Sequence, residues 1–477
     1  MAGETPSKKA MPDTHTPART PTAGTPPPLL IGCASGFSGD RTDGAGPVVD
    51  TLAARGGGTL IFETLAERTL ALAQLARQQD PRAGYEPLLD ELVGPILARC
   101  HAHGIRIVSN FGAANPSGAA RRIAELARAQ GLPAPRIAII HGDDLASPRQ
   151  RALLREQLGP RMDDMDIVSA NAYLGGADIA AALRAGADIV VAGRVADPSL
   201  TVGPALAHFG WREDDWEKLG RATMAGHMLE CGTQVTGGYF AVPGLKDVDG
   251  LHETGFPIAE ISADGDFVVG KATGTGGRVD ARTVKEQLLY EVHDPARYLT
   301  PDVVADLSRA QVVELGADRV QLRGITGHAR PDTLKVNICH RGGWLGEAEI
   351  SYAGVQAEAR ARLAADIVRR RLGSALPLRI DLIGAISILD SDDGALRGAL
   401  PDRHARDVRL RVAGTHADRA VAERVLREVT ALYCCGPAGG GGVRTALRPR
   451  LNMVSCAIDR NAVPGGWRMF DADEDAR

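Results

Sequence analysis

The stretch HGDDL at residues 141–145 combines the side chains that proteins use to move protons. An imidazole can both donate and accept a proton, and Asp143 and Asp144 follow His141 closely, so this group could act as general acid and base on a bound substrate. A turn capped by aspartate is the alternative interpretation of the same residues. We predict His141 and Asp143 as acid/base residues, with Glu67 of the string ETLAERT as a further carboxylate of this kind.

Two asparagines could orient a substrate carbonyl, because a carboxamide both donates and accepts hydrogen bonds. They are Asn110 in NFGAANP and Asn171 in NAYLGG. Cys231 follows Glu230 in ECGTQVTGG and is a candidate nucleophile, although we favour an inert buried thiol at this position. The predicted catalytic set is His141, Asp143, Glu67, Asn110, Asn171 and Cys231.

Three glycine-rich strings could hold an anionic group, because glycine lets backbone N–H groups approach a ligand closely. They are SGFSGDR at 35–41, KATGTGGR at 271–278 and GPAGGGGVR at 436–444. None matches the phosphate-loop or dinucleotide-binding patterns, and plain glycine turns are the alternative. The predicted substrate- and anion-binding set is Ser35, Gly36, Ser38, Asp40, Arg41, Glu63, Asn115, Tyr173, Arg194, Asp197, Gln234, Lys271, Arg278 and Arg444.

Most of these residues follow short apolar runs that alternate with helical segments. Runs with strand character lie at 29–35, 59–65, 105–112, 136–142, 166–173 and 187–195, and helical spacing occurs at 66–78, 119–130 and 178–186. Continuous apolar strands between amphipathic helices are typical of a parallel sheet covered by helices, an α/β fold. Ligands of such sheets bind outside the carboxyl ends of the strands, so the polar strand exits predict one pocket.

The second half of the chain predicts a mixed α+β structure. Beyond about residue 205 the alternation loosens, and antiparallel strands with a turn at Asp264–Gly265 are expected. This half could form a separate lobe or extend the first sheet. We divide the chain into a disordered Pro/Thr-rich leader at 1–28, a parallel α/β lobe at 29–205, a mixed region at 206–470 and an acidic tail at 471–477.

Composition limits the classes of function. The 477 residues carry 55 Lys+Arg against 59 Asp+Glu, so the chain lacks the basic excess of a nucleic-acid-binding protein. No apolar stretch reaches the length of a membrane span, and the 7 cysteines include no C-x-x-C pair. We expect a cytoplasmic protein that binds neither nucleic acid nor membrane.

Several long strings follow one another in a characteristic order: SGFSGDRTD, ETLAERTLAL, SNFGAANP, GADIVVAGRVADPSLTVGP, ECGTQVTGGYF, TVKEQLLYEVHDPARYLTPDVV and GPAGGGGVR. Together they resemble the acyclic terpene utilisation AtuA family, a former domain of unknown function, over roughly residues 30–470. The resemblance implies an association with enzymes that degrade acyclic terpenoids and branched acids through CoA thioesters. Longer members of this family carry an additional small C-terminal ferredoxin-like domain, which we expect this chain to lack.

These observations favour a catabolic lyase or hydratase that acts on a branched acyl-CoA or carboxylate by general acid/base chemistry. A nucleotide- or Mg²⁺-dependent ligase or transferase is an alternative, with the aspartates of the strand exits as magnesium ligands. A non-catalytic ligand-binding subunit is another. We expect a small-molecule substrate, with a CoA thioester as one candidate, and no organic cofactor, and we leave a divalent metal open. A homo-oligomer and a separate partner chain of the AtuA C-terminal type both fit the sequence.

Overall fold

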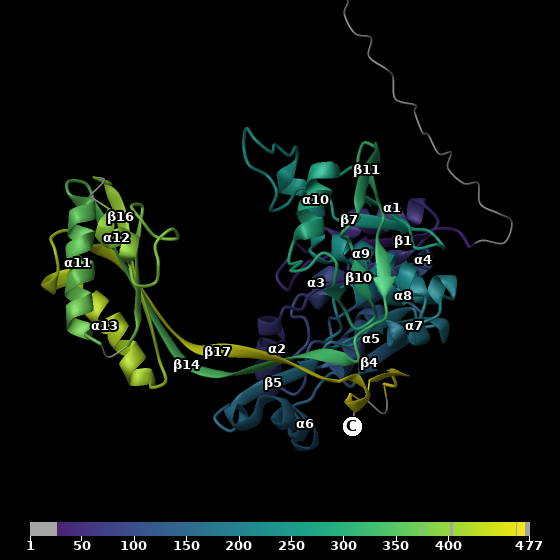
Figure 1. Cartoon of the computed structure of the whole chain (residues 1–477), viewed down its shortest axis with the longest axis horizontal. Coiled ribbons are helices and arrows are strands. Elements are labelled where there is room, and N and C mark those ends of the chain that lie inside the picture. The colour runs from purple at the N-terminus through teal and green to yellow at the C-terminus, as the bar shows by residue number, and fades with distance from the viewer. Residues whose placement is uncertain (1–25, 375, 401–403, 464, 473–477) are drawn as a thin grey trace, which may run out of the picture.

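The computed structural model describes residues 26–374, 376–400, 404–463 and 465–472. The predicted leader up to residue 25 and the predicted tail from residue 473 lie outside these ranges. None of the helices within them combines the length and the apolar character that a membrane crossing requires. Figure 1 shows a large body, a smaller lobe to one side, and two long strands that join them.

The body is built on a ten-stranded mixed sheet. Its spatial order is β11 (Gln311–Gly316), β12 (Arg319–Arg323), β8 (Phe267–Lys271), β7 (Pro257–Ile261), β1 (Leu29–Cys33), β2 (Thr59–Phe62), β3 (Arg106–Ser109), β6 (Ile189–Val191), β4 (Ile137–His141) and β18 (Gly466–Met469). The central strands β1, β2, β3, β6 and β4 pair in parallel, whereas β7, β8, β12, β11 and β18 pair antiparallel. The predicted α/β class is confirmed.

Helices cover both faces of this sheet, and this explains the continuous apolar runs of its strands. Leu30 packs into one apolar layer and the next residue, Ile31, into the other. Full burial of a leucine or isoleucine side chain contributes about 1.5–3 kcal/mol to the free energy of folding. One layer is covered by α1 (Ala45–Ala54), α3 (Leu89–Val93), α4 (Leu97–Ala102) and α5 (Pro116–Ala129), and the other by α7 (Ala177–Arg184), α8 (Ser199–Phe209), α9 (Trp216–Glu230) and α10 (Ala281–Leu289).

The segment predicted as a parallel strand at 166–173 has a different partner. It forms a strand, β5 (Ile167–Ala172), but β5 pairs antiparallel with β14 (Thr333–Ala353) outside the body sheet. Apolar character predicts burial rather than a partner strand, so the sequence alone could not distinguish the two pairings. β5 is flanked by α2 (Glu67–Gln79), and α6 (Pro148–Leu158) packs on β17 (Gly441–Asp459).

Apart from one short helix between its second and third strands, the lobe has the connectivity βαββαβ. The outer half of β14 is followed by α11 (Ala357–Leu372), β15 (Leu378–Ile383), α12 (Ala395–Ala399), β16 (Asp407–His416), α13 (Arg419–Cys435) and β17. Their antiparallel order β15-β16-β14-β17, with α11 and α13 packed on one apolar layer, is the ferredoxin-like arrangement. This lobe lies between β14 and β17, so it differs in position from the additional C-terminal domain of longer family members, whose absence stays a prediction. The predicted glycine loop at 436–444 therefore runs into a strand, because β17 begins at Gly441.

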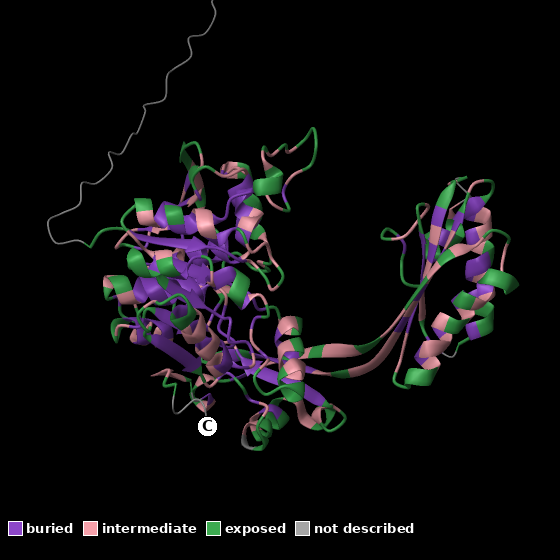
Figure 2. Cartoon of the chain, turned by 180° about the vertical axis from the view of Figure 1, so that it is seen from behind, coloured by how far each residue is buried: buried purple, intermediate pink, exposed green. Residues whose placement is uncertain are grey.

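β14 and β17 also form the arm between lobe and body. They pair from Thr333↔Asp459 at the body to Ser351↔Gly441 in the lobe. Figure 2 shows the buried residues concentrated in the body sheet, whereas the middle of the arm is exposed or half-buried. The inner end of β14 pairs with β5 and so delivers residues of the second half of the chain to the body.

Three short elements close the body beside α9. The strands β13 (Thr326–His328), β10 (Val304–Asp306) and β9 (Tyr298–Leu299) form a small antiparallel sheet. The β7–β8 connection turns at Asp264–Gly265 as predicted, with Gly265 at a φ of 88° that favours glycine. The single-turn 3₁₀ helices are η1 (Gly159–Met162), η2 (Gly232–Thr236), η3 (Leu251–Glu253) and η4 (Arg460–Ala462).

Candidate functional site

A buried arginine, Arg194, stands directly after the carboxyl end of β6. Its side chain is 1% exposed, and its guanidinium donates to the carbonyls of Leu65 at 2.8 Å and Val195 at 2.7 Å. It also forms an ion pair with Asp197, in the turn that precedes α8. The exits of β2 and β6 thus meet at one buried cation. The Arg194 cluster is defined by Arg194 and four polar residues around it: Glu63, Asn110, Asp143 and Asp197.

Asp143 holds the turn that carries Arg194. Its Oδ2 accepts the backbone N–H of Arg194 at 2.9 Å and the amide of Asn171 at 2.9 Å. A side chain at Gly193 would lie 2.8 Å from the same carboxylate, so only glycine fits there. Burial raises the pKa of Asp143 to about 6, although its two hydrogen bonds favour the ionised form and oppose the shift. The predicted acid/base residue Asp143 therefore also positions Arg194.

Glu63 and Asn110 form the buried side of the cluster. The Asn110 amide donates to Glu63 Oε1 at 2.8 Å, and the backbone N–H of Leu65 donates to the same oxygen at 2.7 Å. The Asn110 carbonyl oxygen accepts from the N–H and hydroxyl of Thr64. Burial, and then the charge of Asp197, raise the pKa of Glu63 well above its usual range, against the influence of Arg194.

Asp197 is the member of the Arg194 cluster that reaches the surface. About a third of its side chain, 34%, is exposed. Desolvation raises its pKa to about 6, Arg194 opposes this, and the charge of Glu230 adds to it. Glu63 and Asp197 both face the Arg194 cation, and the charge of Asp197 favours the protonated form of Glu63.

A second group borders the cluster on its more exposed side. The Tyr173 hydroxyl donates to Glu67 Oε1 at 2.7 Å, and the Lys335 ammonium lies 3.3 Å from the same oxygen. Burial opposes ionisation of Glu67, but these two contacts prevail and lower its pKa. The Tyr173 ring also has the Arg194 guanidinium 4.5 Å and the Lys335 ammonium 4.6 Å from its centroid. Burial raises the pKa of Tyr173, which keeps its hydroxyl protonated.

A third group comes from the end of α9. His227 Nδ1 lies 2.8 Å from Glu230 Oε1, and its Nε2 lies 2.8 Å from the carbonyl of Gln287. Both ring nitrogens thus face oxygen acceptors, an arrangement that the doubly protonated imidazolium satisfies. Burial opposes protonation, but the charge of Glu230 and the two hydrogen bonds raise the pKa of His227 above its usual value. Glu230 Oε2 has no hydrogen-bond partner among the described residues.

The loop SGFSGD packs between these groups. The N–H of Gly36 is already bonded to Asp40, and Ser35 donates to the carbonyl of Glu63 at 2.9 Å. A Cβ at Gly36 would lie 2.5 Å from the carbonyl carbon of Cys231, so this glycine permits close backbone contact. Burial raises the pKa of the Cys231 thiol far above its usual range, which disfavours the thiolate that a nucleophile requires.

Several predicted residues lie away from the Arg194 cluster. His141 is exposed at the end of β4, opposite Gly466 of β18. Asn115 caps α5 by accepting the N–H of Gly118. Arg444 lies in the lobe, opposite Glu349.

Other predicted residues have local partners. Arg41 pairs with Asp43, Arg278 with Asp280, and Lys271 lies 3.6 Å from Asp318. Ser38 lies near Glu86, and Gln234 lies near Tyr290.

Sequence reasoning missed three members of the site. His227 lies one helical turn before Glu230, and this i,i+3 spacing was a usable signal. Tyr298, on β9, lies close to His227, with ring centroids 5.3 Å apart. Lys335 enters through β14, more than a hundred residues after Arg194, and no local pattern marks it.

The described residues contain no group of three or more His, Cys, Asp or Glu side chains placed to share a metal ion. Among known proteins, the model of a family described as acyclic terpene utilisation family protein AtuA matches residues 29–469. No curated protein and no solved structure matches the chain.

Proposed function

The chain belongs to the acyclic terpene utilisation AtuA family and so to acyclic terpene utilisation, and from this premise we propose that it is a general acid/base enzyme of that process. We assign it lyase or hydratase chemistry on a branched acyl-CoA or carboxylate. The observation that carries the proposal is the placement of Glu63 and Asp197 around the buried cation Arg194, with the pKa of each carboxyl raised.

A proton held at a raised pKa is the main requirement of this chemistry. Hydration, dehydration and carbon–carbon cleavage next to a thioester all need one group that takes a proton and one that gives a proton. A carboxyl with a pKa of about 6 can do either near neutral pH, whereas an ordinary aspartate is almost fully ionised there. We assign the transfer to Asp197, because it is the exposed member of the pair.

The remaining residues take supporting roles in this proposal. Burial and the charge of Glu230 raise the pKa of Asp197, and Asn110 orients Glu63 through a hydrogen bond. Arg194 limits that shift and holds the Asp197 carboxyl in place. Lys335, with 52% of its side chain exposed, and the Tyr173 hydroxyl offer a cation and a hydrogen-bonding group for the oxygen of a carboxylate or thioester.

Purified full-length protein incubated with branched 3-hydroxyacyl-CoAs and enoyl-CoAs tests the proposal. We expect turnover of at least one substrate, and a loss of about 100-fold or more in kcat for Asp197→Asn. Asp214→Asn is the matched control, because Asp214 is an exposed aspartate paired with Arg212 outside the cluster. No turnover together with no CoA-thioester binding in calorimetry would contradict the proposal, and equal losses in the two variants would remove Asp197 from it.

A further inference from the structure

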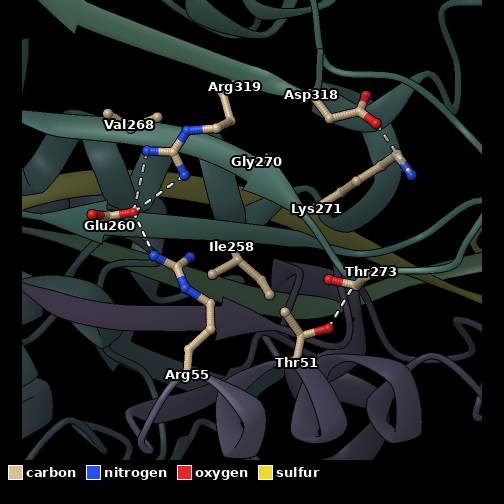
Figure 3. A pocket seen from close by; sticks show the side chains of 10 residues that line it. All are labelled: Thr51, Arg55, Ile258, Glu260, Val268, Gly270, Lys271, Thr273, Asp318 and Arg319. Atoms are coloured by element: carbon tan, nitrogen blue, oxygen red, sulfur yellow. Dashed lines mark hydrogen bonds and ion pairs between the residues drawn. The ribbon is translucent and has the colours of Figure 1, made fainter. Parts of the chain in front are cut away.

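A cavity of about 320 Å³ lies beside the antiparallel extension of the body sheet, between the end of α1 and the strands β7, β8 and β12. It contains none of the residues of the Arg194 cluster. Figure 3 shows that Arg55 and Arg319 approach Glu260 from opposite sides, while Lys271 points toward Asp318. We call this site the Arg319 cavity and define it by these five charged residues: Arg55, Glu260, Lys271, Asp318 and Arg319.

The Arg319 cavity carries more positive than negative charge. Three cationic side chains face two carboxylates. Both guanidinium groups also compete for one oxygen, since Glu260 Oε2 lies 2.6 Å from Arg55 and 3.4 Å from Arg319. The contact with Arg319 is therefore long, and a guanidinium has five donors to satisfy. A second, stronger acceptor placed between the two arginines would improve the hydrogen bonding of both.

Lys271 brings a buried cation to the same cavity. Its side chain is only 8% exposed, and its ammonium donates to the carbonyl of Thr275 at 2.7 Å. The nearest carboxylate oxygen, on Asp318, is 3.6 Å away, which is an ion pair without a close hydrogen bond. A buried ammonium with loose compensation attracts an anion more strongly than an exposed one, because water screens it less.

The chemistry of these three cations selects the ligand class. Planar guanidinium forks suit tetrahedral oxyanions, which accept hydrogen bonds from several directions, and an ammonium adds a point charge. The volume lies at the lower end of the range for small-molecule sites, larger than a lone ion needs. We propose that the Arg319 cavity binds a phosphomonoester group through Arg55, Lys271 and Arg319. The phosphate ester can be a free small molecule or the 3′-phosphate of coenzyme A.

Calorimetric titration of the full chain with inorganic phosphate at low ionic strength tests the site. We expect saturable binding that weakens about tenfold or more in Arg319→Gln, which loses charge-assisted hydrogen bonds. Arg323→Gln is the matched control, because Arg323 is an exposed arginine four residues further along β12 and bonds to Gln321. Its affinity should equal that of the unchanged protein.

A second variant, Glu260→Gln, distinguishes phosphate binding from a purely structural ion-pair cluster. Glu260→Gln removes the carboxylate that competes for both guanidinium groups, so phosphate should bind about tenfold more tightly. A purely structural ion-pair cluster predicts no phosphate binding in either protein. Absence of binding up to about 10 mM phosphate, in both the unchanged protein and Glu260→Gln, overturns the proposal.

Coenzyme A and 3′-dephospho-coenzyme A identify the source of the phosphate. If the ligand is coenzyme A, it should bind more tightly than its dephosphorylated form, and Arg319→Gln should abolish that difference. If both forms bind alike, or neither binds, while inorganic phosphate still binds, the ligand is a separate phosphate ester. Phosphate binding is measured without turnover, so the calorimetric titration still tests the Arg319 cavity if the proposed enzymatic function is wrong.

Discussion

The Arg194 cluster and the Arg319 cavity contain the same types of side chain in opposite proportion and opposite surroundings. The cluster places three carboxyls around one fully buried arginine, and the cavity places three cations around two carboxylates. In the cluster, burial disfavours the charged carboxylates and so raises the pKa values of Glu63 and Asp197. In the cavity, the two arginines are partly exposed to water and the buried Lys271 has only a distant carboxylate, so the positive charge is available to attract an anionic ligand. Charged side chains of the same types thus suit proton transfer in the Arg194 cluster and anion binding in the Arg319 cavity.

Among variants of the two regions, we expect Arg194→Met to lower the free energy of unfolding the most. Arg194→Met leaves Glu63 and Asp197 without their shared cation, so the free energy of unfolding should fall by about 3–5 kcal/mol. Urea unfolding followed by tryptophan fluorescence measures it. This loss of unfolding free energy should become smaller as the pH falls, because protonated carboxyls are uncharged and are not stabilised by the cation. A deficit below about 1 kcal/mol that does not change with pH would show that the cluster does not depend on its charge balance.

The buried pair His227 and Glu230 should give the next largest effect. His227→Gln leaves an uncompensated buried carboxylate and should lower the free energy of unfolding by about 2–4 kcal/mol. The double variant His227→Gln/Glu230→Gln removes both charges and should recover part of that loss. A double-variant cycle in urea measures the coupling. Simple additivity of the two single variants would mean that the histidine is neutral in the folded protein.

Asp143 should make stability depend on pH in a defined direction. Its folded pKa, about 6, lies above the usual unfolded value near 3.9, so the folded state binds a proton more tightly. That stabilisation is complete below about pH 4 and is lost as the pH rises through about 6, roughly 2–3 kcal/mol for this residue. Thermal melting between these pH values should show a slope that Asp143→Asn flattens.

Glu67 supplies the opposite sign for this pH test. Its lowered pKa means that its contribution is present above the unfolded pKa and is lost as the pH falls. Glu67→Gln should therefore flatten the acid side of the melting profile. The pKa shift assigned to Asp143 is incorrect if Asp143→Asn keeps the loss of stability with rising pH, and the shift assigned to Glu67 is incorrect if Glu67→Gln keeps the loss with falling pH.

The smallest effect should come from the Arg319 cavity. Arg319 is 47% exposed, so Arg319→Gln should change the free energy of unfolding by less than about 1 kcal/mol. Urea unfolding at low and high salt measures it, with Arg323→Gln beside it. A loss as large as that of Arg194→Met would mean that the cavity holds the sheet extension together rather than carrying charge available for a ligand.

Sequence reasoning located the Arg194 cluster because parallel strands bring their carboxyl ends together. Glu63, Asn110 and Arg194 each follow a strand of the parallel sheet, so local pattern and topology agree. His141 follows such a strand too, yet it lies exposed next to β18. Position after a strand therefore places a residue at the edge of the sheet but does not say toward which neighbour its side chain points.

The sequence by itself determined the α/β class, the strand exits that carry polar groups, and the family to which the chain belongs. Apolar runs, helix spacing and glycine strings are local properties, and they suffice for these conclusions. Only the tertiary structure decided that β5 pairs with β14, that β14 and β17 form an arm, and that Lys335 joins Tyr173 and Glu67. These contacts join segments far apart in the chain, and their free energy comes from burial and charge pairing that no single segment encodes.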